Sequence, residues 1–347
     1  MTAPPGQLDP ITPPPPPPPD RRGHGRLLVR YLAALLFTAA AAAAAIPDLI
    51  GIDHRGPFAR AIAFRPWVLV AGLVVVVVLL VLVVFRRRAR AALLPFAVGL
   101  LVVLPAGGAM ILPRVLADPV PTTGTPLKVL AFNTYFGGAD PAELAALIAA
   151  ERPDLVSISE AGERFRGKLM PLVEPLGYRS EVSSGSGADV DGVVALVSDR
   201  LGDVRFVGGT GSSHPPYLEA TGGGLGELTF VAYHAAAPTY YRFPHWRDDM
   251  ALLAKWCAGG SPAIVAGDLN ATLDHSLLRK GMAGCTDAAE QRGQGLLSTW
   301  SPTESTELFG PQIDHVLSTA GIDAESFSVH EIDGSDHRAI LTTVRIP

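Results

Sequence analysis

An unbroken apolar run at residues 67–85 constrains the fold of this chain more than any other feature. The run contains no charged side chain, and the cluster Arg86-Arg87-Arg88-Ala89-Arg90 follows it directly. Its length is close to the ~20 residues that a helix needs to cross ~30 Å of hydrocarbon, and basic residues collect at the cytoplasmic ends of such helices. We therefore predict a membrane-spanning helix over residues 67–85, with its arginine end in the cytoplasm.

Two neighbouring segments extend this prediction to a membrane region of about three helices over residues 27–112. Residues 91–112 form a second apolar run, and membrane helices tolerate prolines such as its Pro95 and Pro105. Residues 31–46 form a shorter, alanine-rich run preceded by arginines. This first segment is either a retained span or a cleaved signal peptide, because it has both a basic flank and a small-residue zone. In both cases residue 113 emerges on the outer face.

The segments around the membrane region differ from it in composition. Residues 1–26 are Pro-rich and are predicted to form a disordered tail, either a spacer or a ligand for an SH3-type domain. Residues 113–126 are a predicted linker, and residues 127–347 a predicted catalytic domain. We thus expect a multi-pass cell-membrane protein with an extracytoplasmic catalytic domain, although the arginines of the loop over residues 55–65 oppose this orientation.

Charge divides the chain at the same place. Residues 1–126 contain 12 Lys and Arg against 5 Asp and Glu, net +7, and residues 127–347 contain 16 against 28, net −12, which together give the −5 of the whole chain. Proteins that bind nucleic acid tightly usually carry clusters of Lys and Arg that contact its phosphates. The acidic segment, residues 127–347, has no such cluster. The sequence therefore carries no strong nucleic-acid-binding signature and implies no protein partner. A bound cation would still attract a phosphate ester locally.

Apolar, strand-like runs alternate with helical patterns after residue 126. Asp140 before Pro141 predicts the start of a helix that ends before Pro153, and residues 246–257 predict another. The pattern indicates a mixed α/β domain. The predicted strands are residues 127–132, 155–159, 228–233, 263–266, 312–318, 326–331 and 339–346.

Polar side chains stand where several of these strands begin or end. They are Asn133, Glu160, His234, Asp268, Asn270, Asp314, Asp336 and His337. Mg²⁺ prefers oxygen ligands and takes one or two carboxylates, while it keeps water and substrate phosphate as its other ligands. We therefore predict a Mg²⁺ site held by Asn133, Glu160 and Asp336.

The remaining five side chains suit the hydrolysis of a phosphate ester. His337 and Asp314 form an oriented imidazole and carboxylate, and Asp268 with Asn270 holds a water and a phosphate oxygen. His234 is a second imidazole, which stabilises developing charge or protonates the leaving oxygen. No nucleophilic Ser or Cys is required, so we predict direct attack by water. The other histidines are interpreted as structural or surface groups: His214, His245, His275, His315 and His330.

Together these motifs resemble the endonuclease/exonuclease/phosphatase (DNase I-like) superfamily, which includes nucleases, neutral sphingomyelinases and inositol polyphosphate phosphatases. The resemblance covers about residues 127–347. The run at 267–270 looks like the GDxN element of the family, the run at 335–337 like its closing SDH element, and the run at 299–302 like a loop of its membrane-anchored bacterial branch. The resemblance implies a four-layer α/β sandwich, with two packed β-sheets flanked by helices, and one or two Mg²⁺ or Mn²⁺ ions.

Two positions depart from the family pattern. Ser159 stands where a Gln often precedes the metal-binding Glu, and Tyr135 stands where some nucleases have an Asp. Loss of that Asp removes a second metal ligand and argues against an abasic-site nuclease. Because fold does not select substrate, we expect specificity to reside in the loops at residues 183–191 and 239–246.

The sequence leaves three functions open. The leading hypothesis is a membrane-anchored, metal-dependent phosphoesterase that cleaves a phosphodiester, such as a phospholipid head group or a nucleotide, beside a lipid bilayer. The alternatives are an extracytoplasmic DNase-like nuclease and a catalytically inactive binding module. Cys257 and Cys285 are the only cysteines, and they form a disulfide in an exported domain or stay as thiols in the cytoplasm.

Overall fold

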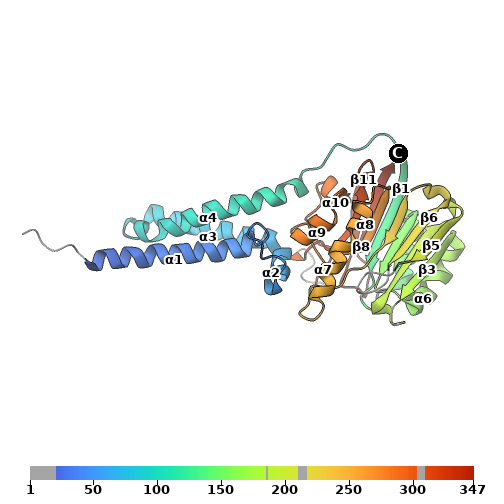
Figure 1. Cartoon of the computed structure of the whole chain (residues 1–347), viewed down its shortest axis with the longest axis horizontal. Helices are drawn as coiled ribbons and strands as arrows, with labels where there is room; N and C mark the ends of the chain where they lie inside the picture. Colours follow the sequence, from blue (N-terminus) through green and yellow to red (C-terminus); the bar gives the residue numbers. More distant parts are fainter. Residues whose placement is uncertain (1–20, 185–186, 210–216, 303–308) are drawn as a thin grey trace, which may run out of the picture.

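Three long helices project from one side of a two-sheet domain (Figure 1). The computed structural model describes residues 21–184, 187–209, 217–302 and 309–347. The long helices are α1 (Arg21–Ala45), α3 (Arg65–Phe85) and α4 (Arg90–Ile111). Shorter helices connect them: α2 (Gly56–Ala61), η1 (Ile62–Phe64) and η2 (Arg87–Ala89), with η3 (Leu112–Val115) after α4.

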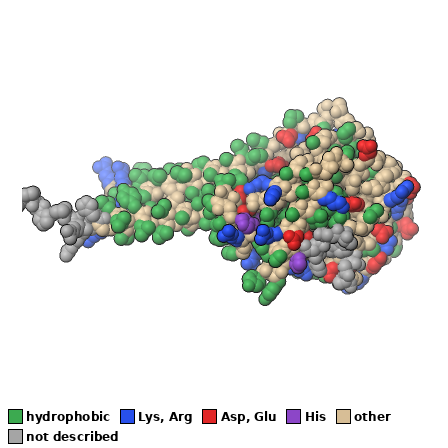
Figure 2. Space-filling model, in the orientation of Figure 1, with side chains coloured by type: hydrophobic (Ala, Val, Ile, Leu, Met, Phe, Trp, Pro, Cys, Tyr) green, Lys and Arg blue, Asp and Glu red, His purple; other side chains and the backbone are tan. Residues whose placement is uncertain are grey.

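The long helices have the length and composition of membrane spans. Three segments qualify among the described residues: Gly25–Ala45, Gly56–Phe85 and Arg87–Val115. The predicted spans fall within them, except that residue 46 lies just beyond α1. The first helix begins at Arg21, so residues 21–26 belong to it rather than to the predicted tail; residues 1–20 lie outside the described part of the chain. Figure 2 shows apolar side chains along the bundle, and charged ones mainly at its far end and over the domain.

The domain contains two six-stranded sheets. The first has the order β11-β12-β1-β2-β4-β3, and the second has the order β5-β6-β7-β8-β10-β9. The strands of the first are β1 (Thr125–Asn133), β2 (Leu155–Ser159), β3 (Tyr178–Ser184), β4 (Gly192–Ser198), β11 (Asp323–His330) and β12 (Ala339–Ile346). Those of the second are β5 (Val204–Gly208), β6 (Leu218–Gly222), β7 (Thr229–Ala232), β8 (Ala263–Asp268), β9 (Cys285–Asp287) and β10 (Asp314–Thr319).

Buried apolar side chains hold these layers together. Val129, Ala195 and Ile264 belong to the core between the two sheets. The outer face of the first sheet packs against α5 (Pro141–Glu151) and α6 (Glu163–Val173). The outer face of the second sheet is covered by α7 (Phe243–Leu252), α8 (Ala254–Cys257) and α9 (Ser276–Gly281). The short helix α10 (Ala288–Gln291) follows β9. The predicted four-layer α/β sandwich is therefore confirmed.

The sequence predicts the start of one of two helices and misses that of the other. The Asp140 side chain accepts a hydrogen bond from the backbone N–H of Ala142 at 2.8 Å and so caps α5, as its sequence predicts. The helix predicted at residues 246–257 begins earlier, at Phe243, and it is split after Leu252 into α7 and α8.

A buried ion network joins the helical bundle to the domain. Asp274 of the domain accepts hydrogen bonds from Arg65 at 2.6 Å and from both terminal nitrogens of Arg114 at 2.8 Å. Asp48, between α1 and α2, pairs with Arg65 and, at 2.7 Å, with Arg279. Arg114 lies within the predicted linker over residues 113–126, so the start of that segment packs against the domain. Its end forms the first residues of β1.

The two cysteines form a disulfide. Cys257 ends α8 and Cys285 begins β9, with their Cα atoms 5.0 Å apart. The bond therefore fixes the outer helical layer to the edge of the second sheet. Since the chain contains two cysteines, it has no free thiol.

Candidate active site

The predicted site residues meet at one edge of the sandwich because of the strand directions. β1 and β2 are parallel, as are β7 and β8, so the ends of these strands carry Asn133, Glu160, His234 and Asp268 to the same edge. β12 is antiparallel to β1, and β10 is antiparallel to β8, so the beginnings of β10 and β12 lie there too. Asp314, the first residue of β10, is the cross-strand partner of Asp268.

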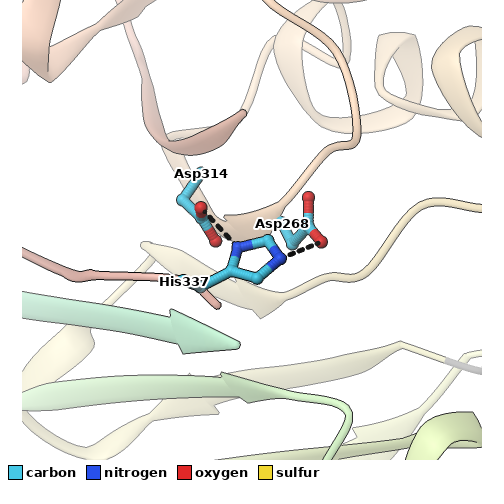
Figure 3. A group of neighbouring side chains, drawn as sticks. All are labelled: Asp268, Asp314 and His337. Carbon is cyan, nitrogen blue, oxygen red and sulfur yellow. Dashed lines mark hydrogen bonds and ion pairs between the residues drawn. The ribbon is translucent and has the colours of Figure 1, made fainter. Parts of the chain in front are cut away.

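A histidine between two carboxylates forms the centre of this site (Figure 3). His337 Nδ1 lies 2.9 Å from Asp314 Oδ2, and its Nε2 lies 3.8 Å from Asp268 Oδ2. All three side chains are buried. The hydrogen bond to Asp314 fixes the ring orientation, so that Nε2 points toward Asp268.

Asp268 is held by amide groups. Asn270 donates its backbone N–H to Asp268 Oδ1 at 2.7 Å and its side-chain Nδ2 to Oδ2 at 3.1 Å. The Asn133 Nδ2 donates to the same Oδ2 at 2.9 Å. Asn270 has a left-handed backbone, φ 49°, which Asn tolerates better than most residues. This conformation turns the chain so that Asn270 can bind the carboxylate two residues before it.

The predicted metal side of the site contains Glu160, Asn133 and Asp336. Asn133 Nδ2 lies 3.2 Å from Glu160 Oε1, while its Oδ1 accepts the backbone N–H of Tyr135 at 2.9 Å. The amide nitrogen of Asn133 thus faces the carboxylates, and the predicted oxygen ligation requires the amide to turn over. Glu160 Oε2 accepts the N–H of Phe136 at 2.8 Å, and the residue has φ 53°.

His234 approaches the site from the second sheet. Its Nε2 lies 3.7 Å from Asp268 Oδ2 and 3.9 Å from Glu160 Oε1. It therefore lies within the same cluster as the other predicted residues. All eight predicted side chains are brought to one place, whereas His275 and His315 are buried elsewhere and His214 lies outside the described residues.

The electrostatics of the site are those of crowded carboxylates. Burial is the main cause that raises the pKa of Asp268 to about 7, and the negative charge of Asp314 raises it further. His337 and the hydrogen bonds from the amide groups act in the opposite direction. Burial alone would lower the pKa of His337, but Asp314 and Asp268 outweigh it and raise that pKa to about 9. Burial is also the main cause of the raised pKa of Asp336. A divalent cation here would offset this excess of negative charge.

The donor set fits such a cation. Asp314 Oδ1 and Asp336 Oδ1 are buried and accept no hydrogen bond within the described chain. Asp268, Asp314 and His337 offer ligand atoms within 4.8 Å of one another. We favour Glu160 and Asp336 as the ligands because Asp314 Oδ2 already engages His337. Carboxylate oxygens suit Mg²⁺ and Mn²⁺.

Four further residues orient the site, and the sequence assigned none of them a role. Trp300 Nε1 donates to Asp336 Oδ2 at 2.9 Å, and Thr299 Oγ1 accepts the backbone N–H of Asp314 at 3.1 Å. Ser335 Oγ donates to the carbonyl of Asn133 at 2.7 Å. Ser159 Oγ lies 3.4 Å from the Asp268 backbone N–H. Ser159 and Ser335 stand beside polar strand ends, whereas the signal for Thr299 and Trp300 was the run at 299–302 that resembles a family loop.

The family relationship follows from a comparison of the whole domain. The model of the endonuclease/exonuclease/phosphatase family matches residues 130–337, which include all eight site residues. The chain belongs to the endonuclease/exonuclease/phosphatase family. Members of this family hydrolyse phosphoesters, and none of the curated proteins compared with the chain matches it.

Solved structures share the fold of this family member at low sequence identity. A family protein from Bacteroides thetaiotaomicron is 14% identical, with a TM-score of 0.52, over 65% of this chain and 99% of that one. A humanized TDP2 from D. rerio is 18% identical, with a TM-score of 0.51, over 63% and 99%. The mannosyl-6-phosphatase Bt3783 of Bacteroides thetaiotaomicron is 13% identical, with a TM-score of 0.50, over 63% and 99%. These likenesses concern the fold alone.

Proposed function

We propose that the protein is a membrane-anchored, divalent-metal-dependent phosphoesterase that cleaves a phosphodiester by direct attack of water. The observation that carries this proposal is the buried chain from Asp314 through His337 to Asp268, set beside Glu160 and Asp336. An imidazole oriented by one carboxylate is suited to move a proton at Nε2. Its Nε2 points to the place where Asp268 and Asn270 would hold a water.

The roles of the other groups follow from their positions. Glu160 and Asp336, with Asn133 after its amide turns over, would hold a Mg²⁺ or Mn²⁺ ion. Such an ion polarises a phosphoryl oxygen and neutralises the charge that develops on it. His234 Nε2, beside Asp268 and Glu160, is placed to donate a hydrogen bond to a phosphate or leaving-group oxygen. No residue is assigned as a covalent nucleophile.

The compartment is part of the same proposal. Disulfides persist in oxidising compartments, and the bond between Cys257 and Cys285 supports an extracytoplasmic domain. The arginines at residues 86–90 lie at the opposite end of the bundle, where the positive-inside bias expects the cytoplasm (Figure 1). The acidic domain disfavours long nucleic acids, so the DNase-like nuclease remains the second candidate.

The test uses the full-length protein in detergent, together with Asp268→Asn and His337→Gln. Hydrolysis of phosphodiesters, phosphomonoesters and plasmid DNA is measured after chelator treatment and after return of Mg²⁺ or Mn²⁺. We expect metal-restored phosphodiester cleavage by the wild type and at least ~100-fold slower cleavage by either variant. Preferred cleavage of plasmid DNA would favour the nuclease. Equal inactivity of all three proteins on every substrate would support the binding module and end the enzyme proposal.

A further inference from the structure

A largely apolar pocket lies between the helical bundle and the catalytic domain. Its volume is ≈ 250 Å³. One wall is formed by α2 and η1, through Ala59, Ala63 and Phe64. The opposite wall is formed by loops of the domain, including Pro238, Thr239 and Pro311. Arg60 is the one permanently charged side chain among the described residues that line it.

Two residues connect this pocket to the active site. Asn270 and Trp300 both line the pocket. Asn270 also donates to Asp268 Oδ2 at 3.1 Å, and Trp300 donates to Asp336 Oδ2 at 2.9 Å. If the phosphate of a substrate lies at these carboxylates, the group attached to that phosphate can therefore reach the pocket.

The two walls are fixed to each other by polar contacts. His275 Nε2 lies 2.7 Å from the carbonyl of Ala59, and Asp53 accepts the backbone N–H of Ser276 at 2.7 Å. The rings of Trp67 and Phe309 add an aromatic contact, with centroids 4.6 Å apart. The pocket is thus built into the junction rather than left by a loose contact.

The position of the pocket indicates what enters it. α3 begins at Arg65, directly after η1, so the pocket lies at the domain-side end of a candidate membrane span. Its volume is below the ~300–1,000 Å³ of pockets that enclose whole drug-sized ligands. A hydrocarbon segment needs only apolar walls. The polar groups of Asn270, His275 and Trp300 are already bonded within the protein, so these walls offer a nucleobase few polar partners.

We infer that this pocket binds a hydrocarbon chain of the substrate, so that the substrate class is an amphiphilic phosphodiester drawn from the bilayer. The inference rests on the proposed function and adds the substrate class to it. The phosphate would lie at Asp268 and Asp336, and the chain would pass Asn270 and Trp300 toward Ala63. Arg60 at the pocket wall would face the polar head-group region.

The test is a series of phosphodiesters that differ only in chain length. Full-length protein in nanodiscs is given 4-nitrophenyl methyl, butyl and octyl phosphate with Mg²⁺, and release of 4-nitrophenolate is followed. The leaving group is constant, so differences in kcat/KM report binding of the chain. We expect kcat/KM of the wild type to rise about three- to fourfold per buried methylene until the pocket is full.

Variants at the pocket distinguish chain binding from partition into the nanodisc. Ala63→Trp fills the pocket and is expected to abolish the rise of kcat/KM with chain length, measured against methyl-ester hydrolysis by the same variant. Ala61→Trp adds the same bulk at an exposed neighbour that does not line the pocket, and it should keep the rise. Partition of the octyl ester into lipid is the same for all variants.

Each outcome has one meaning. Equal dependence on chain length in the wild type and Ala63→Trp overturns the pocket inference and leaves the proposed phosphoesterase intact. If the wild type cleaves no ester of the series and no other phosphoester, the proposed function is overturned, and the inference falls with it. If Ala63→Trp loses methyl-ester hydrolysis as well, Phe64→Ala decides, because removing this apolar wall must weaken the dependence on chain length. An unchanged dependence in Phe64→Ala also overturns the inference.

Discussion

Two histidine–aspartate pairs of the same geometry differ in the surroundings of the histidine ring. His337 Nδ1 lies 2.9 Å from Asp314 Oδ2, and His315 Nδ1 lies 2.9 Å from Asp287 Oδ2; all four side chains are buried. The difference is the second ring nitrogen. His337 Nε2 points to Asp268, whereas His315 Nε2 lies 2.8 Å from the carbonyl of Ala271. The first pair is therefore the one proposed to act on a substrate, whereas the second is bonded within the protein at both ring nitrogens.

This contrast predicts opposite results for matched substitutions. Asp314→Asn should lower kcat by roughly 10²–10⁴-fold, because the imidazole loses the carboxylate that orients it and favours its charged form. Asp287→Asn removes the same type of partner from His315, so it should lower the melting temperature and leave kcat per folded molecule within a few-fold of wild type. Steady-state rates and thermal unfolding in detergent measure both. Equal loss of kcat in the two variants would contradict the assignment.

A second prediction at this scale concerns pH and His275. Burial lowers the pKa of His275 below its ordinary value, and neutral imidazole suits its contacts with Thr272 and Ala59. Between the folded pKa and ~6.5 the unfolded chain binds a proton that the folded chain does not. This residue therefore makes the protein less stable as the pH falls through that window.

The measurement compares the wild type with His275→Gln, which lacks the titrating group. The melting temperature of each is recorded in detergent from about pH 7.5 to about pH 5.5. The stability advantage of the wild type should shrink as the pH falls. His315, whose pKa Asp287 raises against the effect of burial, contributes with the opposite sign but is common to both proteins. A difference that grows toward low pH would refute the argument.

At the scale of elements, α3 has an arginine at each end in two different environments. Arg65 at its start is fully buried between Asp48 and Asp274, while Arg86 at its end is exposed. A buried charge that loses its partner strongly lowers the free energy of unfolding, whereas an exposed arginine contributes little to it. The start of the span is therefore part of the domain interface.

Substitutions at the two ends test this difference. Arg65→Met leaves two buried carboxylates short of a partner, and it should lower the free energy of unfolding by about 3–5 kcal/mol. Arg86→Met should change it by less than about 0.5 kcal/mol. Unfolding in detergent, read by tryptophan fluorescence, provides the comparison. Similar effects of both substitutions would show that the network does not couple the bundle to the domain.

Local patterns explain how much of the fold the sequence predicts. The ends of β1, β2 and β8 were predictable because apolar runs stop at Asn133, Glu160 and Asp268. No strand was predicted between residues 160 and 227, although the described part of that segment contains four. The apolar runs of β3, β5 and β6 are short or interrupted, but β4 has an unbroken apolar run at residues 193–197 that was missed as a strand signal. The predicted site residues do gather in one place, since parallel strands share an edge.

Contacts distant in sequence account for what could not be predicted. Arg114 and Asp274 are 160 residues apart, and no periodicity links them, so residues 113–126 looked like a free linker. The hydrogen bond from Trp300 to Asp336 joins two loops and depends on the whole fold. The direction of the Asn133 amide is likewise set by the backbone of Tyr135 and not by its own position in the chain.

At the scale of the whole molecule, the ion network bears on orientation. The loop arginines at residues 55–65 opposed an outward-facing domain in the sequence, but Arg65 is neutralised by two carboxylates in the structure. The cluster at residues 86–90 has no acidic residue near it in sequence. The charge balance therefore supports the proposed orientation, in which the cluster lies in the cytoplasm and the domain outside.

Cysteine labelling tests this orientation, because both native cysteines are in the disulfide and give no background. Lys168→Cys places an exposed thiol on the domain, and Arg87→Cys places one in the turn between α3 and α4. A membrane-impermeant maleimide should label Lys168→Cys in intact cells and should label Arg87→Cys only after the cells are broken. The reverse pattern would place the domain in the cytoplasm.

The buried network also determines what happens when the chain is cut. Residues 116–120 are exposed and connect the bundle to β1, so they form a natural target for a protease. Asp274 lies on one side of such a cut, and both of its arginine partners, Arg65 and Arg114, lie on the other. Cleavage would therefore leave two fragments held together by these ion pairs, and the domain would stay bound to the helical bundle. A proteolytic cut at this exposed segment would thus not be enough to release the domain.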